Sequence, residues 1–316
     1  MDYYNLVFNI VVVLVSLFII LKASDLVLYG ITGYAKRLGL SKYLAGLVIV
    51  SIAASMPEVI SSLSGWLVGR EEMMVGAILG NNMVHMALLI GVMAIVGKKM
   101  KFESTLLEKS KFLMWIFLLL PLGLLLDGTL SRIDGLVLVL CYGIYIGFLW
   151  QKEKTFGKLK QRVKFSHIWR YGLIFLGALL AMLMAGRWLV IGAVELAEIS
   201  GVPTFFVALI VIGIGSAIDD FAIGIRAVLK GKQEIGIGDA LGSILNELVL
   251  FFGVIALIRP IEIGLNMIWS SLLFLGISIS LVMLFLRKKK MTWKGGLLMV
   301  GIYLVFLAVE ITKVIL

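Results

Sequence analysis

The sequence predicts an all-α membrane protein whose ten transmembrane helices form two inverted-topology five-helix repeats, with both termini outside (N-out/C-out). Three observations predict this fold class. The 316-residue chain is 61% hydrophobic and 15% charged, with a mean hydropathy of +1.08, and long apolar runs recur along it. One half of the sequence matches the other half at a fixed offset. Basic residues gather in alternate loops, where they orient a membrane protein.

The internal repeat has an offset of 162 positions. It aligns Glu58 with Asp220, Gly80 with Gly242, and His85 with Glu247. No gap interrupts the match over about seventy residues, so the chain is two copies of one unit. Each copy holds five predicted spans. Because five is odd, the second copy enters the membrane upside down relative to the first, as in many secondary transporters.

The apolar runs place ten spans along the chain. They cover roughly residues 5–34, 43–69, 73–96, 109–128, 131–150, 169–198, 202–229, 234–258, 266–286 and 293–314. The first repeat takes residues 1–150, a short basic cytoplasmic linker takes 151–168, and the second repeat takes 169–316. The segments that match most closely are about 43–97 and 202–258.

The basic residues predict the orientation of the chain. The loops expected inside hold most of the basic residues: Lys36, Arg37, Lys42, Lys98, Lys99, Lys101, Lys109, Lys111, Lys152, Lys154, Lys158, Lys160, Arg162, Lys164, Lys230, Lys232 and Arg287 to Lys290. Loops expected outside hold only Arg70, Arg132 and Arg259. This bias predicts that both termini lie outside. The net charge of +10 then reflects membrane topology, and no nucleic-acid partner is expected.

Acidic residues inside predicted apolar spans are the main functional signal. They are Glu58, Asp219, Asp220, Asp239 and Glu247. An ionised carboxylate at mid-bilayer costs about 2.5–3.5 kcal/mol. The basic residues well inside spans, Lys22 and Arg187, are too few to neutralise these acids. Protonation and bound cations are the remaining ways to neutralise these acids, so the sequence predicts a cation pathway.

The spacing of polar residues predicts that they converge. Asn81 and His85 lie four positions apart, so they share one face of a helix, and Ser243 and Glu247 do the same. Small residues precede each pair and allow close helix packing.

The helices before these pairs are expected to break. Pro57 removes a backbone donor in the first copy, and Gly213 and Gly215 loosen the second. Carbonyl groups freed beside carboxylates are the hard oxygen ligands that calcium and sodium prefer.

Two short motifs recur in both copies. The first stands as AASMPE at residues 53–58 and as GSAIDD at residues 215–220. The second stands as GAILGN…H at residues 76–85 and as GDALGS…E at residues 238–247. They resemble the alpha-repeats of the cation/calcium exchanger superfamily, in particular of compact prokaryotic sodium/calcium exchangers, which read roughly G-T-S-x-P-E and G-N-x-x-G-S-x-x-x-(N/D).

The resemblance implies a secondary antiporter that moves Ca²⁺, or a similar divalent cation, in exchange for Na⁺ and/or H⁺ by alternating access. Glu58 and Asp220 match the central acids that ligate calcium. The implied ligands around them are Ser55, Ser216 and Ser243, with Asn81 at a serine position, His85 at the asparagine position and Glu247 at the aspartate position. Further candidates are Asp219, Asp239, Asn82 and Asn246. The first and sixth spans resemble the family's long sliding helices.

Departures from the family pattern bear on the coupling ion. Ala54 and Ala217 each replace one of two adjacent hydroxyl residues, which weakens sodium sites. His85 adds an imidazole, which titrates near neutral pH, beside acids. Asp219 and Asp239 stand where the family usually has proline and asparagine. We therefore hypothesise that protons replace at least some of the sodium.

Alternative functions make different demands on the sequence. An Mg²⁺ or Mn²⁺ exchanger with proton coupling would use the same oxygen-rich site, and a passive cation channel is a less favoured alternative. A metalloprotease would need a motif such as H-E-x-x-H, which is absent. The single cysteine, Cys141, excludes an internal disulfide. We expect a multi-pass protein of a prokaryotic plasma membrane that has no covalent cofactor and whose partners are the lipid bilayer and cations, without an evident protein partner.

Overall fold

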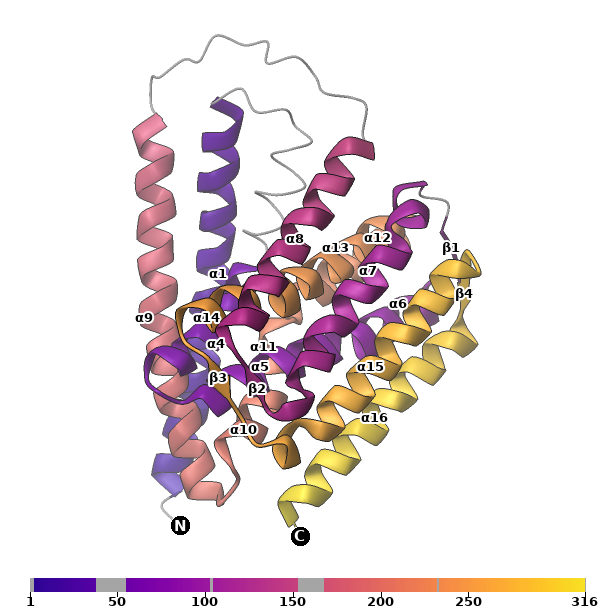
Figure 1. Ribbon diagram of the computed structural model, residues 1–316. Coiled ribbons are helices and arrows are strands. Elements are labelled where there is room, and N and C mark those ends of the chain that lie inside the picture. The colour runs from indigo at the N-terminus through magenta and orange to yellow at the C-terminus, as the bar shows by residue number, and fades with distance from the viewer. Residues whose placement is uncertain (1–2, 38–54, 103–104, 153–167, 232, 316) are drawn as a thin grey trace.

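The computed structural model describes residues 3–37, 55–102, 105–152, 168–231 and 233–315, which are mostly helical (Figure 1). The first half contains α1 (Tyr3–Arg37), α4 (Met56–Leu67), α5 (Glu71–Met83), the π-helical segment η2 (Val84–Leu89), α6 (Ile90–Val96), β1 (Lys99–Lys101), α7 (Thr105–Leu124), the short helix η3 (Leu125–Asp127), β2 (Thr129–Leu130) and α8 (Arg132–Lys152).

The second half repeats this order. It contains α9 (Ile168–Ser200), α10 (Thr204–Val207), the π-helical segment η4 (Ala208–Ile212), α11 (Gly213–Ser216), α12 (Ile218–Leu229), α13 (Gln233–Leu245), the π-helical segment η5 (Asn246–Phe251), α14 (Phe252–Ile258), β3 (Ile261–Glu262), α15 (Leu265–Arg287), β4 (Lys290–Thr292) and α16 (Trp293–Ile315). The segments α5, η2 and α6 match α13, η5 and α14 residue for residue at the offset of 162 positions. The repeat in the sequence is therefore also a repeat in secondary structure.

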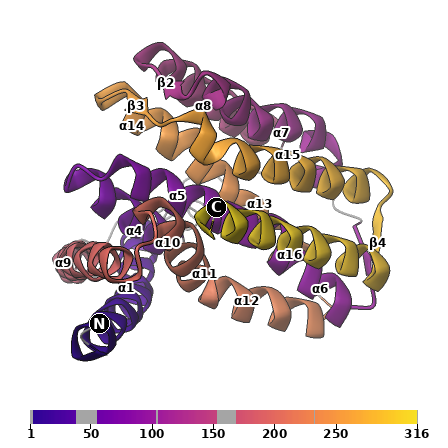
Figure 2. The ribbon, with the colours of Figure 1, turned by 90° about the horizontal axis from the view of Figure 1, so that it is seen from below.

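Equivalent helices run in opposite directions. In Figure 1, α1 runs upward and α9, which lies beside it, runs downward; α8 and α16 are likewise opposed. The beginning of α1 and the end of α16 both lie at the lower end. Figure 2 shows the α1–α9 pair at one side of the remaining helices. Apolar residues of the pair, such as Leu17, Ile20 and Leu189, form a hydrophobic cluster distinct from the main core.

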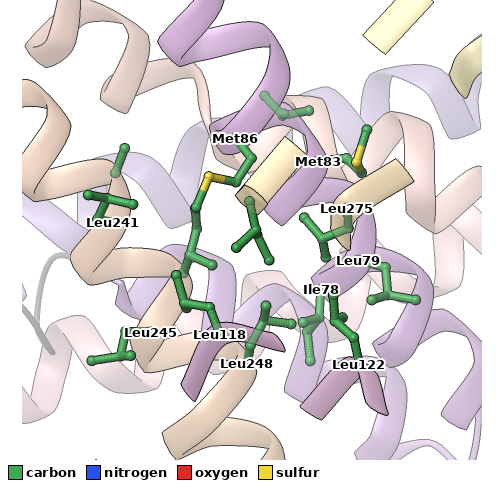
Figure 3. Packing of buried hydrophobic residues seen from close by; sticks show 14 of the residues in the cluster. Ile78, Leu79, Met83, Met86, Leu118, Leu122, Leu241, Leu245, Leu248 and Leu275 are labelled. Carbon is green, nitrogen blue, oxygen red and sulfur yellow. The ribbon is translucent and has the colours of Figure 1, made fainter. Parts of the chain in front are cut away.

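The main core surrounds α5 and α13. Figure 3 shows Ile78, Leu79 and Met83 of α5 facing leucines of α7, α13 and α15. The helix α5 also packs closely on α10 and η4. A Cβ atom added at Gly80 would overlap the backbone carbonyl of Leu209, which shows how near the two backbones are. Small residues let the two backbones meet there.

Two short antiparallel sheets join the halves at their ends. β1 pairs with β4, with Met100 opposite Met291, and β2 pairs with β3, with Thr129 opposite Glu262. The alternation in β1 and β4 buries a methionine and exposes the residues on either side. Neither sheet was expected from the sequence.

Six of the described helical segments are long and apolar enough to cross a membrane: Asn5–Val27, Glu71–Val96, Trp169–Ser200, Gly236–Ile258, Leu265–Arg287 and Trp293–Ile315. The expected span 43–69 is described only from residue 55, and its residues 43–54 lie outside the described part of the chain. The expected span 202–229 is discontinuous. Its helix breaks at Ala217, whereas the sequence placed the break at Gly213 and Gly215, which lie inside α11.

The two helix breaks are equivalent. Ser55 precedes α4 with φ −81° and ψ 5°, and Ala217 precedes α12 with φ −85° and ψ 1°. These two residues are related by the same repeat offset. The turn therefore belongs to the repeated unit, and glycine is not required to form it.

We predict that Gly80→Ala lowers the free energy of unfolding by about 1–3 kcal/mol, because the added methyl group meets backbone rather than a movable side chain. Thermal unfolding of the purified protein in detergent measures the effect. Gly143→Ala on α8 is the matched control, since no described atom lies within 4 Å of its added Cβ. Equal melting temperatures for the two variants would contradict the close approach of α5 and η4.

Candidate functional site

A cluster of polar side chains lies in the apolar core where both helix breaks and two π-helical segments meet. His85 and Asn82 are fully buried, and Glu247 and Asp220 are 1% and 7% exposed. Asn81 and Asn82 lie in the last turn of α5, His85 lies in η2, Asp220 lies in the first turn of α12, and Glu247 lies in η5. Each residue therefore lies in or next to an interruption of a regular helix, and π-helical segments commonly mark functional sites.

Two amides hold the Glu247 carboxylate. Asn81 Nδ2 donates to Oε1 at 2.8 Å, and Asn82 Nδ2 donates to Oε2 at 2.8 Å. A buried carboxylate needs donors for both oxygens, because each unpaired polar atom costs free energy in an apolar core. The end of α5 supplies both donors from consecutive residues.

His85 contacts the second acid of the cluster. Its Nε2 lies 2.5 Å from Asp220 Oδ2, and its Nδ1 lies 3.0 Å from the backbone oxygen of Asn81. A carbonyl oxygen only accepts, so Nδ1 carries a hydrogen. The short contact at Nε2 needs one more hydrogen, held by either the imidazole or the carboxyl group. The His85–Asp220 pair is therefore a place where one proton can be stored.

Asn81 connects the two acids. Its side-chain oxygen accepts a hydrogen bond from Ser216 Oγ at 3.2 Å, and its side-chain nitrogen serves Glu247. The backbone oxygen of Asn81 accepts from His85 in the first repeat, whereas Ser216 and Glu247 belong to the second repeat. Asn81 therefore contacts residues of both repeats. A movement of Asn81 would therefore change the hydrogen bonds of Glu247 directly and those of Asp220 through His85.

A second chain of hydrogen bonds reaches the break before α4. Tyr142 OH on α8 donates to Asn246 Oδ1 at 2.8 Å, and Asn246 Nδ2 donates to Ser55 Oγ at 3.2 Å. The sequence interpretation missed Tyr142. The only available signal was a tyrosine in a predicted span, which alone does not distinguish a buried donor from a lipid-facing ring.

Asn82 Oδ1 is a buried acceptor for which the described residues provide no hydrogen bond. The amide nitrogen of Asn82 also donates to Ile78 O at 2.6 Å, so both of its contacts use the nitrogen. A free oxygen beside a carboxylate suits a cation or a water molecule.

For the remaining predicted site residues, the structure gives the position in a helix but fewer side-chain contacts. Ser243 is buried on α13 four residues before Glu247, and Asp239 is half-buried four residues earlier. Glu58 and Asp219 lie in α4 and α12, but their side chains are outside the described part of the structure. Among described side chains, no three of the His, Cys, Asp and Glu type gather closely enough to hold a metal ion. The oxygens present thus come mainly from amides and hydroxyls around Asp220 and Glu247.

One buried acid was overlooked in the sequence. Glu310 on α16 is fully buried and accepts hydrogen bonds from Ser270 at 2.5 Å and Ser271 at 3.0 Å. Lys313 lies 3.4 Å from its other carboxylate oxygen. The sequence reasoning counted only Lys22 and Arg187 as possible partners for buried acids. The structure adds Lys313 beside Glu310 and His85 beside Asp220.

Comparisons with known proteins agree over nearly the whole chain. The sequence profile of the family described as "Sodium/calcium exchanger protein" matches residues 8–151 and 171–312. The inner membrane protein YrbG of Escherichia coli is 28% identical over 309 residues, which cover 93% of this chain and 94% of that protein.

Two solved structures share the fold. The H⁺/Ca²⁺ exchanger CAX superposes with a TM-score of 0.75 at 17% identity, covering 97% of this chain and 86% of that one. The sodium-calcium exchanger NCX_Mj superposes with a TM-score of 0.65 at 18% identity, covering 96% and 99%. At these identities the likeness concerns the fold alone.

We predict that Tyr142→Phe lowers the free energy of unfolding by about 0.6–2 kcal/mol, because Asn246 Oδ1 loses its donor in a buried setting. Thermal unfolding in detergent is the measurement. Tyr303→Phe on α16 removes a hydroxyl from a similarly buried ring away from this chain of bonds and serves as the control. A melting temperature for Tyr142→Phe no lower than that of the control would contradict the prediction.

Proposed function

The chain belongs to the sodium/calcium exchanger protein family, and on that premise we propose that it exchanges Ca²⁺, or a similar divalent cation, for protons by alternating access. As a family member it is a multi-pass membrane antiporter for cations, and hence a secondary transporter rather than an enzyme. The observation that carries the choice of protons is the 2.5 Å contact between His85 Nε2 and Asp220 Oδ2.

The proposed membrane arrangement has ten spans in two inverted repeats, residues 1–150 and 169–316, joined by the linker 151–168. The repeated order of elements and the opposite directions of equivalent helices support it. The proposed orientation has both termini outside. It is supported by the β1–β4 sheet, whose Lys99, Lys101 and Lys290 lie at the end of α15 and α16 away from Ile315.

The proposed cation ligands come from both repeats. They are Glu58, Asp220, Ser55, Asn81, His85, Ser216, Ser243 and Glu247, with Asp219, Asp239, Asn82 and Asn246 as further candidates. Burial supports this assignment for most of the described members, because an apolar core strengthens the attraction between a carboxylate and a cation. Asn82 Oδ1, which accepts no hydrogen bond from the described residues, supports it as well.

Coupling follows from competition for the same oxygens. In the present arrangement, donors of the chain itself occupy the described carboxylates: His85 faces Asp220, and two amides face Glu247. A divalent cation needs these oxygens as ligands. Its binding at Asp220 must therefore displace the proton shared with His85, after which neutral His85 can offer Nε2 as a ligand.

Sodium coupling has less support in this site. A sodium ion would need several hydroxyl and carbonyl oxygens, and the buried Ala217 leaves one hydroxyl position of the helix break empty of oxygen. The Ser55 hydroxyl is already an acceptor for Asn246. Fewer neutral oxygens remain for a monovalent ion, whereas a proton needs only the His85–Asp220 pair.

We predict that Glu58→Gln and Asp220→Asn each reduce exchange to background, because each removes a negative charge that a divalent cation requires. Uptake of radiolabelled calcium into proteoliposomes measures exchange. Asp25→Asn is the control, since Asp25 is exposed on α1 and its partner Lys22 lies 3.8 Å away. Normal uptake by both acid variants, with monodisperse protein, would remove the site assignment.

We predict that His85→Asn flattens the dependence of calcium uptake on pH. In the unmodified protein, a lower pH on the binding side favours the protonated pair and should raise the apparent KM for calcium, and a higher pH should lower it. Uptake is measured over about pH 5.5–8, across the range in which histidine titrates. Unaltered pH dependence in the variant would overturn proton coupling, and a requirement for internal sodium would favour sodium.

A further inference from the structure

A groove of about 450 Å³ lies between α7 and α15, away from the polar cluster. α7 contributes Lys111, Phe112 and Trp115, and the last two turns of α15 contribute Met283, Leu284 and Arg287. Trp115 Nε1 donates to Ser280 Oγ at 3.3 Å, which ties the two helices together along the groove.

The groove has an apolar body and a basic end. Phe112 and Leu284 are 67% and 47% exposed although they line a hollow. Lys111 lies in the second turn of α7, and Arg287 is the last residue of α15, so both cations stand at the same end. None of the described residues that line the groove is acidic. Because α15 is long enough to span a membrane and ends at Arg287, this end lies at a membrane surface.

The β1–β4 sheet extends the basic surface. Its strand β4 follows α15 directly. The sheet exposes Lys99, Lys101 and Lys290 and buries Met100 and Met291. The turns that enter the two strands hold Lys98 and Lys289 with φ of 56° and 54°. This left-handed conformation favours glycine or asparagine, so lysine at both turns is not explained by backbone geometry.

The opposite end of the same helix pair lacks these features. By the repeat offset, Lys111 corresponds to Leu273 and Arg287 to Leu125. Leu125 is fully buried and Leu273 is 51% exposed, so neither equivalent position carries a charge. The equivalent sheet carries Glu262. The fold therefore does not require a basic groove, and membrane orientation alone would require charge but no hollow.

We propose that this groove binds an anionic phospholipid. The phosphate lies against Lys111 and Arg287, and an acyl chain lies along Phe112, Leu284 and Met283. Two positive charges beside an apolar channel at a membrane surface match a negatively charged headgroup attached to a hydrocarbon chain. This proposal is independent of the ion that the protein exchanges.

The test uses the full-length protein, delipidated in detergent and titrated with phosphatidylglycerol or with phosphatidylcholine of the same acyl chains. Native mass spectrometry counts retained lipid, and thermal unfolding reports the stabilisation. The double variant Lys111→Gln/Arg287→Gln is expected to weaken phosphatidylglycerol binding by about 30-fold and to leave phosphatidylcholine unaffected. The control is Arg226→Gln in α12 combined with Lys230→Gln directly after α12, because this double variant removes the same charge from exposed positions outside the groove.

A second variant tests the apolar part. Leu284→Trp fills the groove and keeps both cations, so it should also reduce retention of phosphatidylglycerol. Unchanged retention in the double variant, or an equal loss in the α12 control, would overturn the proposal. Inorganic phosphate that stabilises the protein as much as phosphatidylglycerol would also overturn it, because that result indicates a free anion site.

Discussion

The structure depends on keeping two buried carboxylates satisfied. Glu247 and Asp220 lie in an apolar core where an unpaired charge is costly, and the chain meets this requirement with two amides and one imidazole. All three donors come from five consecutive residues at the end of α5 and the start of η2. The acids come from the other repeat, so the hydrogen bonds also hold the two halves together.

This requirement explains the irregular backbone at the centre. Side chains from both repeats converge only if the helices that carry them come close, and Gly80 permits that approach by leaving room for the Leu209 carbonyl. The break at Ala217 directs the start of α12 toward the cluster, and the π-helical segments rotate His85 and Glu247 relative to a regular helix. Inside a membrane, such breaks are tolerated where the backbone is buried in protein.

Sequence reasoning indicated several of the residues that contact one another here, but not how they pair. The repeat and the buried charges indicated Asn81, His85, Asp220 and Glu247, because charge inside an apolar run is informative without coordinates. Ideal helical spacing placed Ser243 on the face of Glu247, yet the described bonds to Glu247 come from Asn81 and Asn82. A π-helical segment changes the angle between successive side chains and has no clear sequence signal. Tyr142 reaches the cluster from another helix, a contact that no local pattern encodes.

The same hydrogen bonds that stabilise the core make exchange chemically reasonable. The partner of Glu310 is the lysine side chain of Lys313, and lysine side chains ordinarily stay charged across the physiological pH range. Histidine differs, because the imidazole ring can be charged or neutral and keeps its contact to the Asn81 carbonyl through Nδ1 in both forms. A site built on histidine can therefore hold its acid in the absence of a cation and release it when one arrives. Replacing that imidazole with lysine would preserve charge balance but remove the ability to alternate between proton and metal.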